Sequence, residues 1–161
     1  MKLNSETQKK IASEWFKYLQ LEMCKEFESL ERKAAKRKRI KPSIFKKKIW
    51  NKKDPRDGGG QYYLLKKGQI FDQVGINYSK VKGVFPKNFK SKIPGTKNSS
   101  SYWASGISIV AHMKNPKIPA MHFNTRFVVT SKNWFGGGMD VTPSFKDSSE
   151  KKLFHKELKV L

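Results

Sequence analysis

Two short segments of the chain carry polar side chains at a spacing that could form a reactive surface. Ser108 and His112 lie four residues apart, and His122, Asn124 and Arg126 follow at alternate positions. Side chains alternate between the two faces of a β-strand, so each group would share one face of its own strand. Together the groups offer a hydroxyl, an amide, a guanidinium and two imidazoles, and an imidazole can serve as an acid, a base or a metal ligand.

The pattern by itself leaves simpler interpretations open. A histidine can be a surface or hydrogen-bonded structural residue, Arg126 can form a surface ion pair, and Asn124 can sit at a sheet edge. The two polar faces lie on the same side of a sheet only if the strand register allows it. In the second segment the other face would be largely apolar, with Met121, Phe123, Thr125 and Phe127.

Metal binding is a further alternative for the three histidines of the chain. His112, His122 and His155 could hold a divalent ion, because three neutral imidazoles are a sufficient ligand set. Their spacing of ten and thirty-three residues does not specify such a site. The sequence contains no phosphate loop, no dinucleotide fingerprint, and no HExxH or GxSxG motif. The glycine triplets 58–60 and 136–138 indicate turns or a close backbone approach.

The elements that would position these groups are strands preceded and followed by helices. Residues 61–65 and 70–81 are expected to form a hairpin around the Lys67-Gly68 turn, and 107–112 and 121–130 two further strands. Residues 86–101 are expected to form a loop. A short helix is expected from a cap at 147–150 through Leu158. This order predicts a single α+β domain over 1–161, an antiparallel sheet flanked by helices, with the sheet-rich part at 58–161.

An amphipathic helix followed by a basic run is predicted for residues 5–41. Apolar residues recur at three- and four-residue spacing and would form the buried stripe. Arg32 to Lys41 could be a nucleic-acid arm or a solvated helix end favoured by the helix dipole, and Pro42 ends the pattern. Cys24 flanks the stripe and is expected to be buried. The stripe consists of Ile11, Trp15, Leu19, Met23, Phe27 and Leu30.

The charge and cysteine content set limits on partners and location. A formal charge of +22, from 35 basic and 13 acidic residues, favours an anionic partner: nucleic acid, an acidic membrane surface or a small polycarboxylate. The excess is mainly lysine spread along the whole chain, which gives nucleic-acid binding no support beyond charge. The single cysteine excludes an intramolecular disulfide, and no apolar run is long enough to span a bilayer. The chain is expected to be cytoplasmic.

Three blocks of the sequence resemble oxygen-dependent coproporphyrinogen III oxidases, enzymes of haem biosynthesis. The first is 58–60 with 69–79, similar to the family's GGG and GxxFExGGVNxS patterns. The second is 104–127, which resembles AxGxSxVxHPxNPxxPxxHxNxRxF. The third is 134–143, which resembles WFGGGxDLTP. The blocks occur in the family's order and cover most of residues 50–160.

The resemblance implies oxidative decarboxylation of coproporphyrinogen III to protoporphyrinogen IX, with molecular oxygen as oxidant and no organic cofactor. It assigns substrate contacts to Ser108, Asn124 and Arg126, and the proton donor to His122. It assigns metal ligands to His112, His122 and His155. Asp140 could contact the pyrrole N–H groups and stabilise developing positive charge.

The chain also departs from the family pattern. Met113 replaces the usual proline after the first histidine, and Lys82 replaces a frequent histidine. Family members are about twice this length and usually homodimeric, so the resemblance covers their N-terminal half and implies an incomplete fold. Two interpretations remain open: one part of an enzyme completed by a C-terminal chain, or an inactive fragment of a split or decaying gene. A basic nucleic-acid-binding protein is the alternative of another class.

Overall fold

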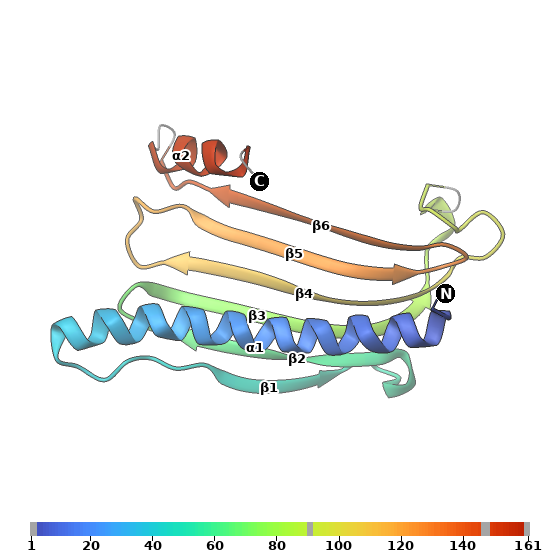
Figure 1. Cartoon of the computed structure of the whole chain (residues 1–161), viewed down its shortest axis with the longest axis horizontal. Coiled ribbons are helices and arrows are strands. Elements are labelled where there is room, and N and C mark those ends of the chain that lie inside the picture. The colour runs from blue at the N-terminus through green and yellow to red at the C-terminus, as the bar shows by residue number, and fades with distance from the viewer. Residues whose placement is uncertain (1–2, 90–91, 146–148, 160–161) are drawn as a thin grey trace.

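One long helix lies across one face of a six-stranded antiparallel sheet, with a second, short helix beside the last strand (Figure 1). The computed structural model describes residues 3–89, 92–145 and 149–159. The predicted α+β class, with an antiparallel sheet flanked by helices, is confirmed.

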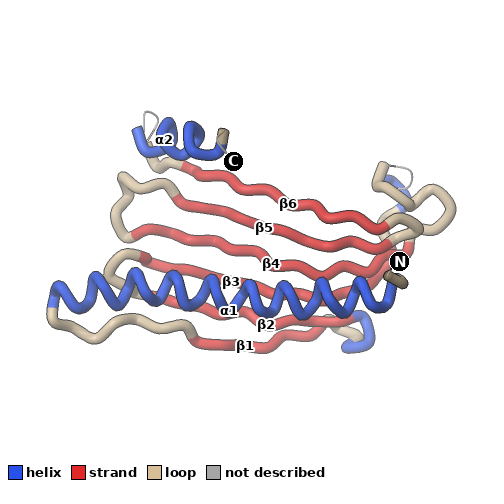
Figure 2. Tube along the Cα trace, viewed as in Figure 1, coloured by secondary structure: helices blue, strands red, loops and turns tan. Residues whose placement is uncertain are grey.

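The strands follow one another across the sheet in the order in which they occur in the sequence (Figure 2). Every pair is antiparallel, so the sheet is a simple meander with β1 and β6 at its edges. The strands are β1 (Lys46–Asn51), β2 (Gly58–Lys66), β3 (Phe71–Val84), β4 (Ser101–Met113), β5 (Ala120–Val129) and β6 (Asn133–Thr142).

The first helix, α1 (Ser5–Lys38), begins at a side-chain cap and ends in its basic run. Asn4 Oδ1 accepts a hydrogen bond of 2.9 Å from the Thr7 N–H, which satisfies one of the free donors of the first turn. Three basic residues, 36–38, occupy the last turn, where they interact favourably with the helix dipole. The run 32–38 is therefore a helix end, and the helix stops three residues before the predicted residue 41.

The predicted buried stripe of this helix is partly wrong. Phe16 is the fully buried aromatic side chain of α1, whereas Ile11 and Trp15 remain about half exposed, at 54% and 51%. Leu30 is also exposed, while Leu19, Met23 and Phe27 pack against the core. The helix packs mainly on β3, β4 and β5, and the face it buries there is rotated from the predicted apolar stripe.

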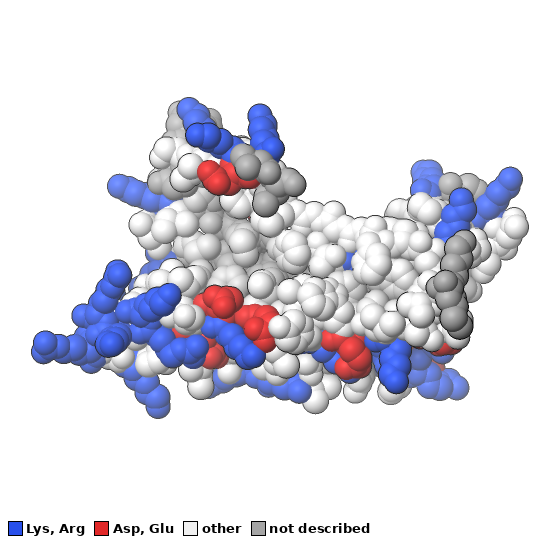
Figure 3. Space-filling view, in the orientation of Figure 1, with Lys and Arg blue, Asp and Glu red and all other residues white. Residues whose placement is uncertain are grey.

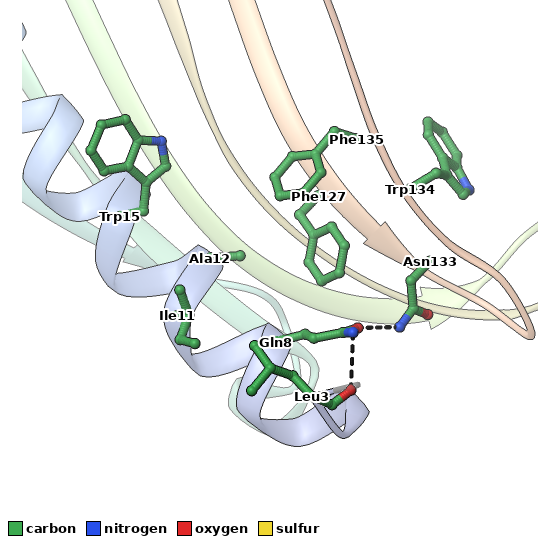
Figure 4. Close-up of a pocket in the computed structure, with 9 residues that line it drawn as sticks. All are labelled: Leu3, Gln8, Ile11, Ala12, Trp15, Phe127, Asn133, Trp134 and Phe135. Carbon is green, nitrogen blue, oxygen red and sulfur yellow. Dashed lines mark hydrogen bonds between the residues drawn. The ribbon is translucent and has the colours of Figure 1, made fainter. Parts of the chain in front are cut away.

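The exposed part of the stripe borders an apolar groove between α1 and the end of the sheet (Figure 4). The groove measures about 370 Å³ and lies between Ile11 and Trp15 of α1 and Phe127 and Phe135 of the sheet. A hydrogen bond of 2.6 Å from Asn133 Nδ2 to Gln8 Oε1 closes one end. Figure 3 shows that the surface between α1 and α2 carries few charged side chains.

Two buried polar side chains of α1 fix the helix on the sheet. The Gln20 side chain donates hydrogen bonds of 3.0 and 2.8 Å to the backbone carbonyls of Gln61 and Ile76. Its Oε1 accepts a hydrogen bond of 2.9 Å from the side-chain amide of Gln61. Glu31 accepts from the backbone N–H groups of 69, 70 and 71 at the turn between β2 and β3. Buried polar groups are tolerated when they are hydrogen-bonded in this way, and such bonds set the helix position along its axis.

Cys24 is buried against the sheet, as predicted. Desolvation, reinforced by the nearby negative charge of Glu28, raises the pKa of the Cys24 thiol to about 12. The thiol is therefore neutral at physiological pH and acts as a small apolar core residue.

The sequence patterns missed β1 and β6 altogether. The β1 sequence KKKIWN is basic and, except for half-buried Trp50, exposed, and β6 contains the second glycine triplet. Both triplets belong to strands, but Gly58 also ends the short turn of residues 55–57 with φ +106°, so the turn interpretation holds there and is wrong for 136–138. The close-approach interpretation holds for Gly60 and Gly137, because a Cβ there would meet a neighbouring backbone oxygen at 2.0 and 2.4 Å.

The C-terminal helix α2 (Ser149–Leu158) packs near β6 and agrees with the predicted short helix. The predicted cap residues Asp147 and Ser148 lie outside the described residues. Neither described helix has the length and apolar character needed to cross a membrane.

Candidate functional site

The strand register places the polar groups on the face of the sheet opposite α1. Ser108 of β4 lies directly across from Asn124 of β5, and Gly106 lies across from Arg126. His122 is two residues from Asn124 along β5 and so shares its face. The two polar faces, whose relative placement the sequence left open, therefore lie on the same side.

Three of the predicted side chains line one hollow on this face. It measures about 370 Å³ and contains Ser108, Asn124 and Arg126. The Arg126 guanidinium donates a hydrogen bond to Asn124 Oδ1. This bond occupies the amide oxygen of Asn124, so its NH₂ group and the rest of the guanidinium remain available as donors. The site can bind a carboxylate, because a guanidinium can hold both oxygens of one.

Asn77 and Ser79 of β3 also line this hollow, and neither was predicted as a site residue. The indole N–H of Trp50 in β1 donates a hydrogen bond of 2.9 Å to Asn77 Oδ1 and so orients that side-chain amide. The indole crosses β2 above Gly60, where a Cβ would come within 3.0 Å of two ring carbons. The sequence did carry a signal for these two residues, because Asn77 and Ser79 are polar and lie at alternate positions of the block 69–79. That block was interpreted only as a strand of the predicted hairpin.

His122 forms a pair with Asp140 of β6. The two residues lie opposite each other in the register, and His122 Nδ1 is 3.0 Å from Asp140 Oδ1. In the neutral histidine this contact favours the proton on Nδ1, which leaves Nε2 free to accept a proton. In the charged form both ring nitrogens carry a proton, so Nε2–H becomes a donor. The pair is therefore arranged for acid–base chemistry next to the hollow.

The three histidines predicted as metal ligands do not form a ligand set within the described part of the chain. The rings of His112 and His122 face each other edge to face, with centroids 6.3 Å apart. His155 lies exposed on α2 and its ring contacts Phe154. Among the residues whose side chains the structure describes, no three of His, Cys, Asp or Glu are close enough to hold a metal ion. The three histidines therefore do not form a site for a divalent metal ion in the described part of the chain.

The fold and this face define a class of protein. An antiparallel meander covered by a helix on one face presents a guanidinium, an amide, a hydroxyl and a His–Asp pair on the other. Such a surface carries the groups needed to bind an acidic ligand and to exchange protons with it.

The chain belongs to the coproporphyrinogen III oxidase family, whose model matches residues 11–161. The resemblance of the three sequence blocks is thereby confirmed. Curated relatives named oxygen-dependent coproporphyrinogen-III oxidase share nearly half of their aligned residues with it. The chain is 47% identical to that of Rickettsia felis over 151 residues, covering 94% of this chain and 53% of the relative.

Two further relatives give the same result. The Rickettsia typhi protein is 47% identical over 158 residues, which are 98% of this chain and 55% of the relative. The Rickettsia bellii protein (strain OSU 85-389) is 46% identical over 152 residues, 94% of this chain and 53% of the relative. The chain therefore spans about half the length of the curated relatives it matches, and the sheet described above lies within that half.

Proposed function

We propose that this chain supplies the substrate-binding sheet of an oxygen-dependent coproporphyrinogen III oxidase. The reaction is the oxidative decarboxylation of two propionates of coproporphyrinogen III, which yields protoporphyrinogen IX. The observation that carries the proposal is the placement of Arg126, Asn124 and Ser108 in one hollow beside the His122–Asp140 pair.

Recognition of the substrate follows from its four carboxylates. Arg126 holds one propionate through two parallel hydrogen bonds, and its contact with Asn124 keeps the guanidinium fork oriented. The Asn124 NH₂ group and the Ser108 hydroxyl donate to the same carboxylate or to its neighbour. The overall charge of +22 attracts the tetra-anion from a distance.

The chemistry requires the loss of CO₂ and two hydrogens from each propionic acid group. The bond to the carboxyl carbon and one C–H bond next to the pyrrole break, and a carbon–carbon double bond forms. One O₂ that takes up two electrons and two protons as H₂O₂ balances each vinyl group. Oxygen is thus the oxidant, and the balance requires no organic cofactor.

His122 exchanges the proton in this step, and Asp140 positions the His122 ring. Because Asp140 Oδ1 engages Nδ1, the other ring nitrogen is the one presented to the substrate. The second oxygen of Asp140 has no hydrogen-bond partner among the described residues. This oxygen can contact a pyrrole N–H and stabilise the positive charge that develops there, which is the role expected for Asp140. No step is assigned to a metal, since His112, His122 and His155 do not form a ligand set in this half of the fold.

A second polypeptide, or the second half of a longer chain, completes the enzyme in this proposal. The surfaces that such a half would cover are the apolar groove beside α1 and the outer edge of β6, which pairs with no further strand among the described residues. The completed protein would form the homodimer usual for the family. A cytoplasmic location is in keeping with the single, buried free thiol of Cys24.

The direct test measures oxygen-dependent conversion of freshly reduced coproporphyrinogen III by this chain, alone and together with the C-terminal half of a Rickettsia relative. Turnover in either sample, lost without oxygen, supports the proposal. A folded chain that neither turns over in either sample nor binds coproporphyrin III would identify an inactive fragment.

Arg126→Ala is expected to weaken binding of coproporphyrin III about ten- to a hundredfold, because hydrogen bonds to a charged group are lost. Fluorescence titration of the porphyrin measures the change. Arg56→Ala is the matched control, since Arg56 is exposed and paired with Asp54 at a distance from the hollow. Equal affinities of the two variants would contradict the assignment of Arg126.

Gly138→Val is expected to weaken the same binding about tenfold or more, by filling space at the border of the site. Gly138 lies opposite Asn124, and a Cβ there meets nothing within 4 Å. The fold should accept the change, with equal or higher thermal stability, since valine favours a strand. Gly75→Val is the control, because its Cβ space is also open but its strand partners Leu64 and Val110, unlike Asn124, do not line the hollow. Unchanged affinity of Gly138→Val would show that the ligand binds elsewhere.

A further inference from the structure

A second hollow, of different character, adjoins the polar one on the same face of the sheet. It measures about 300 Å³ and shares Ala104 and Arg126 with its neighbour. Its remaining lining is aromatic or aliphatic: Phe85, Ile93, Pro94, Tyr102, Val128 and Trp134. Arg126 therefore lies at the junction of a polar and an aromatic compartment.

The outer wall of this aromatic hollow comes from the β3–β4 connection, which is tied to the β5–β6 turn. The Thr130 hydroxyl donates 2.8 Å to the Pro94 carbonyl, and the Ser131 hydroxyl donates 2.9 Å to the Gly95 carbonyl. Gly95 has φ +80°, and a Cβ there would lie 2.1 Å from Thr130 Oγ1, so only glycine allows this approach. The wall is thus built into the fold.

Two aromatic groups give the hollow its shape. Phe85 and Tyr102 stack with ring centroids 4.3 Å apart. Trp134 lies over Gly136, whose Cβ would come within 2.8 Å of the indole ring. Figure 4 shows the Trp134 indole on the opposite side of β6 from Phe135, as strand alternation requires. Flat aromatic surfaces around an apolar space favour a planar ring.

The Trp134 side chain also carries an unused hydrogen-bond donor. Its Nε1 is buried, and no residue of the described chain accepts a hydrogen bond from it. A buried donor without a partner costs about 1–3 kcal/mol, so native proteins seldom keep one without a purpose. Trp134 and Arg126 are diagonal neighbours across the β5–β6 pair, close enough for long side chains to reach one ligand group.

We propose that the aromatic hollow is a subsite for the pyrrole ring whose propionate binds Arg126, and that Trp134 Nε1 donates a hydrogen bond to that propionate. The identity of the ligand rests on the proposed function, while the division into two compartments rests on the lining residues. The carboxylate lies at the junction, and the ring it belongs to packs between Trp134 and Tyr102.

The subsite selects the substituent beside the propionate. A methyl group fits an apolar wall, whereas an acetate in the same place would bury an unpaired charge there. Coproporphyrin carries methyl groups at these positions, and uroporphyrin carries acetates. The wild-type chain should therefore prefer coproporphyrin III.

The test is a fluorescence titration of the purified chain with coproporphyrin III and with uroporphyrin III. Trp134→Phe keeps an aromatic ring but removes the N–H, and should weaken coproporphyrin binding about tenfold. Its thermal stability should stay close to that of the wild-type chain, because the lost donor had no partner. Trp15→Phe, a half-exposed tryptophan on the opposite face, is the matched control and should bind like wild type.

The outcomes separate this inference from the proposed function. If Arg126→Ala weakens binding but Trp134→Phe does not, the subsite is wrong and the proposed function stands. If Trp134→Phe lowers thermal stability and affinity in parallel with Trp15→Phe, its role is structural and the inference fails. Absence of porphyrin binding by the wild-type chain, both alone and together with the completing half, would overturn both.

Discussion

Replacing His122 by alanine is expected to lower oxygen-dependent turnover of coproporphyrinogen III by about two to four orders of magnitude, the usual contribution of a general acid or base. Binding of coproporphyrin III should change little, because the carboxylate contacts of Arg126 and Asn124 remain. The measurement compares turnover and porphyrin affinity in the active preparation, with the completing half present if turnover requires it.

Two companion variants make the His122 result specific. Asp140→Asn should lower turnover by less than His122→Ala, because the imidazole remains but the carboxylate that orients it is lost. His112→Gln removes the neighbouring imidazole on the same face and should cost less than either change. Turnover unchanged in Asp140→Asn would remove Asp140 from the mechanism. A loss in His112→Gln as large as in His122→Ala would show that the two rings act together.

Replacing Glu31 by alanine is expected to lower the free energy of unfolding by about 3–5 kcal/mol. The fully buried carboxylate accepts hydrogen bonds of 2.6, 2.9 and 2.9 Å from the backbone N–H groups of Gln69, Ile70 and Phe71. The variant leaves these donors without a partner at the turn between β2 and β3. Urea denaturation followed by circular dichroism measures the loss.

Glu28→Ala is the matched control for Glu31. Glu28 lies on the same helix, accepts one backbone hydrogen bond from Phe45 and forms a partly exposed ion pair with Arg32. Its loss should cost only about 1 kcal/mol. Equal destabilisation by the two variants would mean that the buried triple contact does not fix α1 on the sheet.

The sequence predicted the parts of the fold whose burial imposes a clear pattern. Strands β3, β4 and β5 alternate apolar and polar residues because one face packs on α1, and all three were expected. The edge strands β1 and β6 carry lysines or glycines in place of that alternation, so nothing local marks them. The helix was recognised, but spacing alone could not say which side of a wide apolar stripe meets the sheet.

The candidate site was predictable only within single strands. Alternation grouped Ser108 with His112, and His122 with Asn124 and Arg126. The contact of His122 with Asp140 depends on the pairing of β5 with β6, a strand that was not predicted. The support of Asn77 by Trp50 depends on a side chain that crosses an intervening strand. Contacts of this kind follow from register, which local sequence does not contain.

The meander order has a consequence for how the chain folds. Each strand pairs with its immediate neighbours in the sequence, so closing the next hairpin costs little loop entropy. The helix, which precedes the strands in the sequence, also makes contacts across much longer stretches of chain, as in the hydrogen bond between Gln8 and Asn133, 125 residues apart. During synthesis the strands can join the sheet one at a time, and α1 is already present to cover the apolar face as it forms. The order of translation is thus also an order of assembly.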